Sequence, residues 1–384
     1  MVPLEGIRIL DLSLLLPGPY CSRLLADLGA EVIKIEPRGG DMTRYELVVF
    51  DSINCNKKSI CLNLKSEEGR RIFHRLAETA DGILEGFRPG VTRRLGVDYD
   101  TIRKINPKII YCSISGYGQD GPYRDRPGHD INYLGVAGVV SVSGDLDGAP
   151  AAAGGVPIAD LTSSMFAALS IVAALMARER TNRGQYIDVS MTDGALSWMG
   201  YRISEYFAKG RCSKGKLISK GAYGVFEVAD GRYITIGAIE DVFWRNLCQS
   251  LGREDLINDP RFSNSLARME NRRGLFSILN PIFKSRTRDE WAKILTEGDV
   301  PWGPVNTIEE VFTDLQLLSR ELFEEVSYPA FGDLKQIRFP VKFSETPAKN
   351  FSSAPRPGQH AEEILLALGY TSSEIEDLRK EEVI

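Results

Sequence analysis

The sequence predicts an α/β fold, in which helices connect the strands of a parallel sheet, followed by a smaller α+β unit. Apolar strands at 7–12 and 31–36 flank a helix with apolar spacing through Leu24, Leu25 and Leu28. A strand, a turn, a helix and a second strand in this order begin a parallel sheet. Three more apolar strands extend the same pattern: 60–64, 83–85 and 109–114.

A chain of 384 residues is longer than one hydrophobic core usually supports. Gly, Lys, Arg and Ser dominate 209–220, which indicates a connection between domains. The next segment has the pattern of a β-hairpin around Ala229-Asp230-Gly231. We therefore predict four parts: a large domain at 1–208, a linker at 209–222, a small α+β domain at 223–325, and a return segment at 326–384 whose helix packs on the large domain.

The composition is typical of a soluble globular protein, with 43% hydrophobic and 26% charged residues. A net charge of −5 gives no basic excess for binding a nucleic acid. The six cysteines show neither CxxC nor zinc-ligand spacing, so we expect buried reduced thiols and no metal. The N-terminus has no signal-peptide pattern, and the apolar run 165–177 is too short to span a membrane. We expect a cytoplasmic protein without a membrane partner.

Basic residues follow two of the predicted strands. Arg38 comes directly after the strand at 31–36, and Arg88 lies in the glycine-rich exit after 83–85. Ligands of open α/β sheets bind at the carboxyl ends of strands, and the first turn lacks the GxGxxG dinucleotide pattern. A polyanionic ligand shared by Arg38, Arg88, Arg94, Lys57 and Lys58 fits this pattern. The alternative is a solvated basic rim.

His129 is one of three histidines and stands in the segment Gly128-His129-Asp130-Ile131-Asn132-Tyr133. Histidine exchanges a proton near neutral pH, so His129 is the leading candidate for proton transfer. Asp160 enters a long apolar helix, and Glu240 follows the second strand of the hairpin. Each of these carboxylates can serve catalysis or act as a helix N-cap.

Several segments along the chain resemble the class III CoA-transferase superfamily, which also contains the α-methylacyl-CoA racemases. The segments that carry the resemblance are 24–37, 87–90, 94–96, 115–119, 184–190 and 358–365. The resemblance implies a Rossmann-like large domain, a small domain and an interlocked homodimer that binds acyl-CoA at the sheet edge. Coenzyme A is then part of the substrate, and no separate cofactor is expected. The predicted contacts with coenzyme A are Arg38, Lys58, Gly86, Phe87, Arg94, Leu95, Gly128 and Tyr133.

The superfamily contains two chemistries. In transferases, the residue matching Asp160 attacks the acyl-CoA thioester and then carries CoA as an aspartyl thioester. In racemases, the residues matching His129 and Asp160 remove and return the α-proton of a 2-methylacyl-CoA, and the residue matching Glu240 supports the histidine.

Sequence features divide between these two chemistries. The segment 128–133, Glu240 with its neighbours 237–239, and Gly86 resemble racemases, and the glycine-rich loop of formyl-CoA-type transferases is missing between 214 and 223. In contrast, the entry 156–160 and the segment 161–164 resemble transferases. Because His129 and Glu240 carry chemistry whereas 161–164 mostly pack, we predict a racemase, with CoA transfer through Asp160 as the alternative.

Overall fold

The computed structural model describes residues 1–144, 148–152, 155–210, 221–328 and 332–384. The chain divides into two compact units. Unit 1 consists of Met1–Ser141, Pro150–Cys212 and Glu321–Ile384, and unit 2 of Val142–Ala149 and Ser213–Arg320. Most of the predicted linker, and the loop compared with formyl-CoA-type transferases, fall on 211–220, which lie outside the described residues.

Unit 1 is organised around a six-stranded sheet in which every paired neighbour is parallel. The strand order is β3-β2-β1-β4-β5-β6, which is the Rossmann order. This confirms the prediction of an α/β fold with a central parallel sheet. The strands are β1 (Arg8–Asp11), β2 (Glu31–Glu36), β3 (Lys57–Cys61), β4 (Gly82–Glu85), β5 (Ile110–Ser115) and β6 (Gln185–Ser190).

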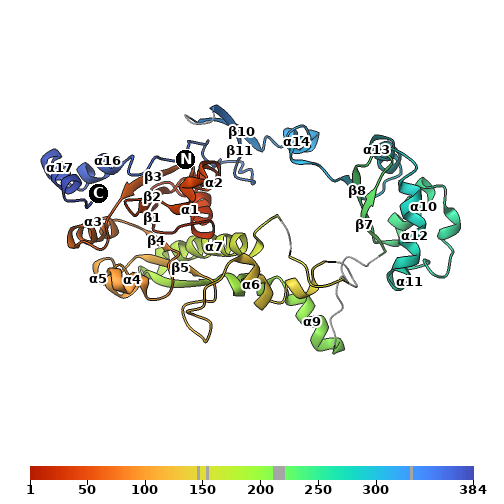
Figure 1. Ribbon diagram of the computed structural model, residues 1–384, viewed down its shortest axis with the longest axis horizontal. Helices are drawn as coiled ribbons and strands as arrows, with labels where there is room; N and C mark the ends of the chain where they lie inside the picture. The colour runs from red at the N-terminus through yellow and green to blue at the C-terminus, as the bar shows by residue number, and fades with distance from the viewer. Residues whose placement is uncertain (145–147, 153–154, 211–220, 329–331) are drawn as a thin grey trace. The chain divides into compact units, whose positions relative to one another are not determined.

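Helices cover both faces of this sheet (Figure 1). Side chains alternate along each strand, so Leu10 and Ile33 join one core while Ile9 and Val32 join the other. The first core is closed by α3 (Glu67–Glu78), α5 (Tyr99–Ile105), α16 (Ala361–Ala367) and α17 (Ser372–Lys380). The second core is closed by α1 (Pro17–Asp27) and α7 (Ile158–Thr181). Burial on both faces explains why β1, β2, β4 and β5 are rich in apolar residues.

Helix α7 is longer than the apolar run seen in the sequence. It has 24 residues and a mean hydropathy of 1.8 in its most apolar window, so by length and composition it meets the criterion for a membrane span. Its inner side packs against α1 and the sheet through Ala167, Ile171 and Ala174. Within unit 1, Leu169 and Met176 on the same helix are about two-thirds exposed. The expected homodimer stays a prediction.

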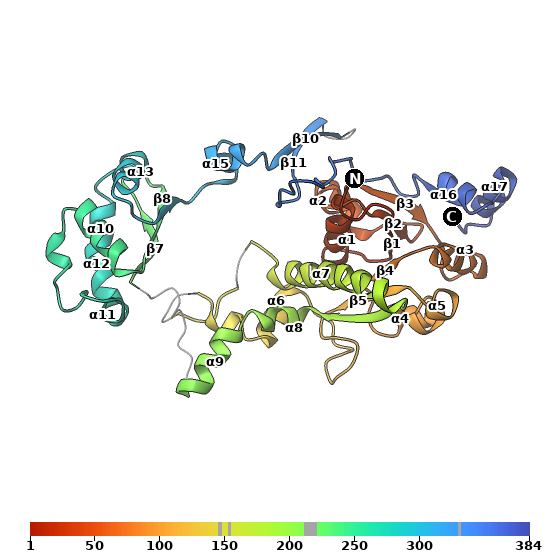
Figure 2. The same ribbon diagram turned by 180° about the vertical axis from the view of Figure 1, so that it is seen from behind.

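Several shorter elements complete unit 1, and Figure 2 shows them from the opposite side. They are η1 (Met42–Tyr45), α2 (Leu47–Asn54), α4 (Val91–Leu95), α6 (Asp130–Val136), α8 (Met191–Ser197), α9 (Gly200–Lys209) and the antiparallel pair β10 (Phe323–Tyr328) and β11 (Gly332–Ile337). A further short turn of helix, η2 (Val140–Val142), leads out of α6.

Unit 2 contains a three-stranded antiparallel sheet of order β7-β8-β9. The strands are β7 (Ala222–Glu227), β8 (Tyr233–Ala238) and β9 (Trp302–Pro304). The predicted hairpin is confirmed, because β7 pairs with β8 from Ala222↔Ala238 to Glu227↔Tyr233. The helices are α10 (Asp241–Ser250), η3 (Glu254–Leu256), α11 (Ser265–Glu270), α12 (Arg272–Phe283), α13 (Arg288–Glu297), α14 (Ile308–Val311) and α15 (Leu315–Ser319).

The described cysteines are free and buried, as the sequence analysis predicts: Cys21, Cys55, Cys61, Cys112 and Cys248. Burial raises the pKa of these thiols, most strongly at Cys21 and Cys112. They therefore behave as small apolar core residues rather than as thiolate nucleophiles.

Candidate functional site

The candidate site lies where the strand order of the sheet reverses, between β1 and β4. Ligands of open α/β sheets bind in the crevice outside the carboxyl ends of such strands. A cavity of ≈ 690 Å³ lies there in unit 1. Its walls come from the exits of β1, β4 and β5, from the loop that enters α6, and from the start of α7.

Seven of the candidate residues named from the sequence line this cavity together. They are His129, Asp160, Gly86, Phe87, Arg88, Gly128 and Tyr133. His129 and Asp160 are 31 positions apart in the sequence, so only the fold brings them to one cavity.

Asp160 is not the residue that caps α7. The backbone N–H groups of Ala159 and Asp160 donate to Oδ1 of Asp130, at 2.6 and 3.3 Å. Asp130 therefore satisfies two of the donors that every helix leaves free at its N-terminus. In the described part of the chain, no group hydrogen-bonds the carboxylate of Asp160. It faces the cavity free for a ligand.

The environment of Asp160 changes its acidity. Burial first, and then the negative charge of Asp130, raise the pKa of Asp160 from 3.8 to about 6. A carboxylate with a raised pKa is more basic and more nucleophilic than an ordinary aspartate, and it is still mostly ionised at neutral pH. This suits Asp160 to act as a nucleophile or as a proton acceptor.

Tyr133 forms one wall of the cavity and fixes the backbone beside His129. Its hydroxyl donates to the carbonyl oxygen of Gly128 at 2.5 Å. A Cβ on Gly116 would lie 2.4 Å from the Tyr133 ring, and a Cβ on Gly128 would lie 2.7 Å from it. Glycine at both positions therefore lets the ring pack against the main chain. Burial and the charge of Asp160 raise the pKa of Tyr133 to about 12, so it stays a phenol.

A buried ionic network supports the wall formed by the exit of β1. Nζ of Lys34 donates to the carbonyl oxygen of Ser13 at 2.9 Å, and the Ser13 N–H donates to Oδ1 of Asp11 at 2.9 Å. Nζ of Lys57 lies 3.2 Å from Oδ2 of Asp11. Burial alone would raise the pKa of Asp11, but Lys57, Lys34 and nearby hydroxyls lower it to about 2. The network holds the turn that places Leu15, at a φ of 65°, against the cavity.

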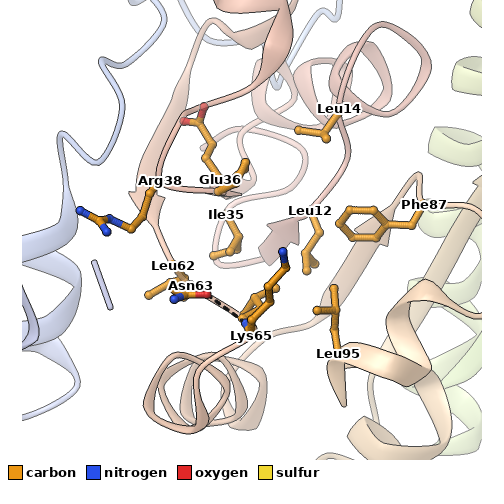
Figure 3. A pocket seen from close by; sticks show the side chains of 12 residues that line it. Leu12, Leu14, Ile35, Glu36, Arg38, Leu62, Asn63, Lys65, Phe87 and Leu95 are labelled. Carbon is orange, nitrogen blue, oxygen red and sulfur yellow. Dashed lines mark hydrogen bonds between the residues drawn. The ribbon is translucent and has the colours of Figure 1, made fainter. Parts of the chain in front are cut away.

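A second cavity of ≈ 410 Å³ adjoins the first, since Leu14 and Phe87 line both. Figure 3 shows it between the exits of β1, β2 and β3. Arg38, Phe87 and Leu95, all predicted contacts with coenzyme A, line it together with Lys65. Nη1 of Arg38 lies 2.8 Å from Oε2 of Glu382 at the C-terminal end of the chain, and both side chains are largely exposed.

The structure places three predicted basic contacts elsewhere. Lys57 is fully buried against Asp11, and Nζ of Lys58 pairs with Glu31 and Glu363 at 2.9 and 2.6 Å. Both lysines begin β3, so they lie at the opposite edge of the sheet from the carboxyl ends. Arg94 is exposed on α4 and lines neither cavity. Lys57 and Lys58 stand at the amino end of their strand, whereas Arg38 and Arg88 follow the carboxyl ends of theirs.

Comparison with known proteins identifies the family. Residues 4–361 match CoA-transferase family III. The chain belongs to this family. An acyl-CoA transferase of Fusarium pseudograminearum is 36% identical over 99% of this chain and 88% of its own length. Succinyl-CoA:glutarate CoA-transferase of Mus musculus is 35% identical over 98% and 89%. A CAIB/BAIF family protein from Brucella suis has a TM-score of 0.87 and 33% identity, covering 96% and 99% of the two chains.

These matches confirm the predicted superfamily but do not support the preferred racemase branch. The two relatives from Fusarium pseudograminearum and Mus musculus are named as transferases, which favours the alternative chemistry, CoA transfer. The segment 161–164, which resembles transferases, is therefore the better guide to the branch than 128–133. Ser164 belongs to this segment and links α7 to α1, because its hydroxyl donates to the carbonyl oxygen of Pro17 at 2.6 Å.

Glu240, the predicted partner of His129, lies in unit 2 and precedes α10. Its side chain makes no capping hydrogen bond with that helix. Since His129 lies in unit 1, their pairing stays a prediction. Among the residues that the structure describes, no three His, Cys, Asp or Glu side chains group as metal ligands would.

The sequence assigned no role to two carboxylates that lie next to residues of the cavity wall, Asp130 and Glu85. Asp130, described above, caps α7; the sequence offers Asp160 for that task just as readily. Glu85 ends β4 and is 2% exposed, and its Oε2 accepts a hydrogen bond from the Phe87 N–H at 2.7 Å. Burial raises the pKa of Glu85 to about 7. The sequence signal for Glu85 is a single carboxylate at the end of an apolar strand.

Proposed function

We propose that this protein transfers coenzyme A from an acyl-CoA donor to a free carboxylate, with Asp160 as the nucleophile. The observation that carries the proposal is the carboxylate of Asp160, which faces the cavity because Asp130 caps α7 in its place. The transferase names of the relatives support the same chemistry.

The two adjoining cavities suit the two ends of an acyl-CoA. In this proposal the nucleotide end binds beside Arg38 and Lys65, whose cationic side chains suit phosphate groups. The pantetheine arm then passes Leu14 and Phe87, which line both cavities, and delivers the thioester to Asp160. The apolar character of these two residues matches the uncharged arm.

The reaction proceeds in two symmetrical halves. An oxygen of Asp160 attacks the thioester carbonyl, the C–S bond breaks, and a mixed anhydride and CoA thiolate result. The thiolate attacks the Asp160 carbonyl, which releases the first carboxylate and leaves an aspartyl-CoA thioester. The acceptor carboxylate attacks this thioester, so that CoA thiolate leaves and a second anhydride forms. The thiolate then attacks the acceptor's acyl carbon, yielding the new acyl-CoA and free Asp160.

Trapping of the intermediate tests this proposal. The protein is incubated with an acyl-CoA and hydroxylamine, and its peptides are analysed by mass spectrometry. We expect hydroxamate at Asp160, because hydroxylamine attacks the activated acyl carbon of the anhydride or thioester. Asp160→Asn is the control and must remain unlabelled. Transfer of CoA without any modification of Asp160 would show that the covalent route is incorrect.

Racemisation of a 2-methylacyl-CoA is the second candidate, because His129 and Asp160 line the same cavity. One residue would remove the α-proton, and the other would return a proton to the opposite face of the enolate. Incubation with a 2-methylacyl-CoA in deuterium oxide distinguishes the candidates by NMR. Racemisation requires α-deuterium uptake that is lost in His129→Ala, whereas CoA transfer requires no uptake.

A further inference from the structure

One buried hydroxyl group distinguishes the cavity that contains Asp160. Ser115 ends β5 and lines this cavity, and the residue is 6% exposed. Its Oγ is buried, and no group in the described ranges of the chain forms a hydrogen bond with it. Burying a hydroxyl without a partner costs free energy, so such a group in a folded protein calls for an explanation. A substrate in the cavity can supply the missing partner.

Two other residues that line this cavity carry hydroxyl groups, and both hydroxyls are engaged. Oγ1 of Thr43 donates to Oδ1 of Asp41 at 2.8 Å, and the Tyr133 hydroxyl donates to the carbonyl oxygen of Gly128. These two donors therefore hold the walls of the cavity. The hydroxyl of Ser115 differs from them, because its proton is available for a ligand.

The backbone around Ser115 is fixed, so its hydroxyl has a defined position. Strand β5 lies between β4 and β6, and Ser115 itself pairs with Ser190. The carbonyl oxygen of Gly116, the next residue, accepts hydrogen bonds from the N–H and the hydroxyl of Thr192, at 3.1 and 2.8 Å. A donor on such a rigid element needs little reorganisation when charge develops beside it.

The proposed reaction creates negative charge at the thioester carbonyl. When an oxygen of Asp160 attacks the carbonyl carbon, a C–O bond forms and the π electrons of the C=O bond move to the carbonyl oxygen. This oxyanion then reforms the C=O bond and expels the CoA thiolate. A hydrogen-bond donor beside the oxygen stabilises the transition state more than it stabilises the uncharged thioester, and it therefore accelerates the reaction.

Three arginines also line the cavity, but they differ from Ser115 in exposure. Arg88, Arg124 and Arg126 are exposed in unit 1. Water screens the charge of an exposed guanidinium, whereas a hydrogen bond from a buried donor acts in a medium of lower dielectric constant. Ser115 is therefore better suited than the arginines to stabilise a charge that forms and disappears within the cavity.

We infer that Ser115 is a further catalytic residue, whose hydroxyl donates a hydrogen bond to the oxyanion that forms when Asp160 attacks the thioester. This inference rests on the proposed function. Ser115 keeps its proton throughout, so it acts neither as an acid nor as a base. The same hydroxyl serves the later attacks of the reaction, because each of them converts a carbonyl oxygen into an oxyanion in this cavity.

Ser115→Ala tests this role, and Ser113→Ala is its matched control. Ser113 lies two positions earlier on β5 and is 1% exposed, and its Oγ accepts a hydrogen bond from the Tyr186 hydroxyl at 2.9 Å. The exchange of CoA between succinyl-CoA and radiolabelled succinate gives kcat and KM. Hydroxylamine trapping gives the rate at which Asp160 is labelled, and thermal denaturation gives the stability of each variant.

We expect kcat in Ser115→Ala to fall by about 100-fold, with the KM for succinyl-CoA unchanged. Labelling of Asp160 should slow by a similar factor. The melting temperature should stay the same or rise, because the variant removes a hydroxyl that no described group satisfies. Ser113→Ala should show the opposite pattern. Its melting temperature should fall because the Tyr186 hydroxyl loses its acceptor, and its kcat should stay that of the unmodified protein.

Three results would overturn the inference. One is an unchanged kcat in Ser115→Ala. Another is a loss of activity together with a loss of stability, which a purely structural hydroxyl would give. The third is a higher KM for succinyl-CoA with an unchanged kcat, which would assign the hydroxyl to binding of the thioester before it reacts. Failure of the proposed function looks different and would overturn both, since then the unmodified protein itself transfers no CoA and Asp160 is not labelled.

Discussion

Replacing Asp160 by asparagine should stabilise the protein while abolishing CoA transfer. The fold holds the carboxylate of Asp160 beside Asp130 in a partly buried position, which raises its pKa from 3.8 to about 6. Ionisation of this group is therefore less favourable in the folded than in the unfolded protein. Asparagine has nearly the same shape and no charge, so it removes this cost.

The magnitude follows from the size of the pKa shift. About two pKa units correspond to about 3 kcal/mol, at 1.36 kcal/mol for each unit. Because Asp160 faces an open cavity where water screens the charge, we expect about 1–2 kcal/mol. The free-energy cost of holding ionised Asp160 in the folded protein is absent below the pKa that this group has in the unfolded chain. It grows as pH rises from about 4 to 6, and it is complete above the pKa of Asp160 in the folded protein. The stability difference between Asp160→Asn and the unmodified protein should follow the same course.

Thermal denaturation at pH 4 and at pH 7.5 measures this difference. At pH 7.5 we expect a melting temperature about 2–4 °C higher for Asp160→Asn, and a much smaller difference at pH 4. Asp125→Asn is a control, since Asp125 is 83% exposed and its removal should change little. A variant no more stable than the unmodified protein at pH 7.5, or a difference that does not depend on pH, would refute the reasoning.

Two further predictions concern the same cavity. The kcat/KM for CoA transfer should rise with pH through about 6 and then level off, because Asp160 must lose its proton to act as a nucleophile. A value of kcat/KM that falls over this pH range contradicts the role of Asp160. Gly116→Ala should lower stability by about 1–3 kcal/mol, because the new Cβ would lie 2.4 Å from the Tyr133 ring. Gly135→Ala on α6 is its control, because a Cβ added at Gly135 would have no atom within 4 Å apart from its chain neighbours and its own helix backbone. Equal melting temperatures for both variants would contradict the packing argument.

Much of the fold was predictable because local patterns encode it. Strands β1, β2, β4 and β5 overlap the short apolar runs of the sequence, and β7 and β8 flank a turn whose residues favour a hairpin. Strand β3 was predicted at 60–64 but spans Lys57–Cys61, because its pairing with β2 begins at the two lysines before the apolar residues. Strand β6 was missed because four of its six residues are not buried in unit 1, so its sequence lacks the apolar run.

The sequence singles out a site residue when its type is rare, as for the three histidines, but the role of an aspartate or a lysine stays ambiguous because these types are common. His129 and Asp160 do share a cavity. The distinction between Asp130 as a cap and Asp160 as a free carboxylate depends on a contact between α6 and α7, which no local pattern contains. Lys57 and Lys58 were predicted to contact the ligand because they lie next to an apolar strand. They stand at the amino end of β3, so they lie at the edge of the sheet opposite the carboxyl ends where the cavities are.

The capping of α7 by Asp130 separates two tasks that lie next to each other in the chain. Asp130 holds two helices together, whereas His129 beside it is an exposed residue of the cavity wall. The hydrogen bonds that place Asp160 come from the side chain of Asp130, whereas His129 takes part in the frame through its backbone, whose N–H donates to Oδ1 of Asn132 at 3.0 Å. The imidazole of His129 is therefore not one of the groups that hold the reacting carboxylate in place.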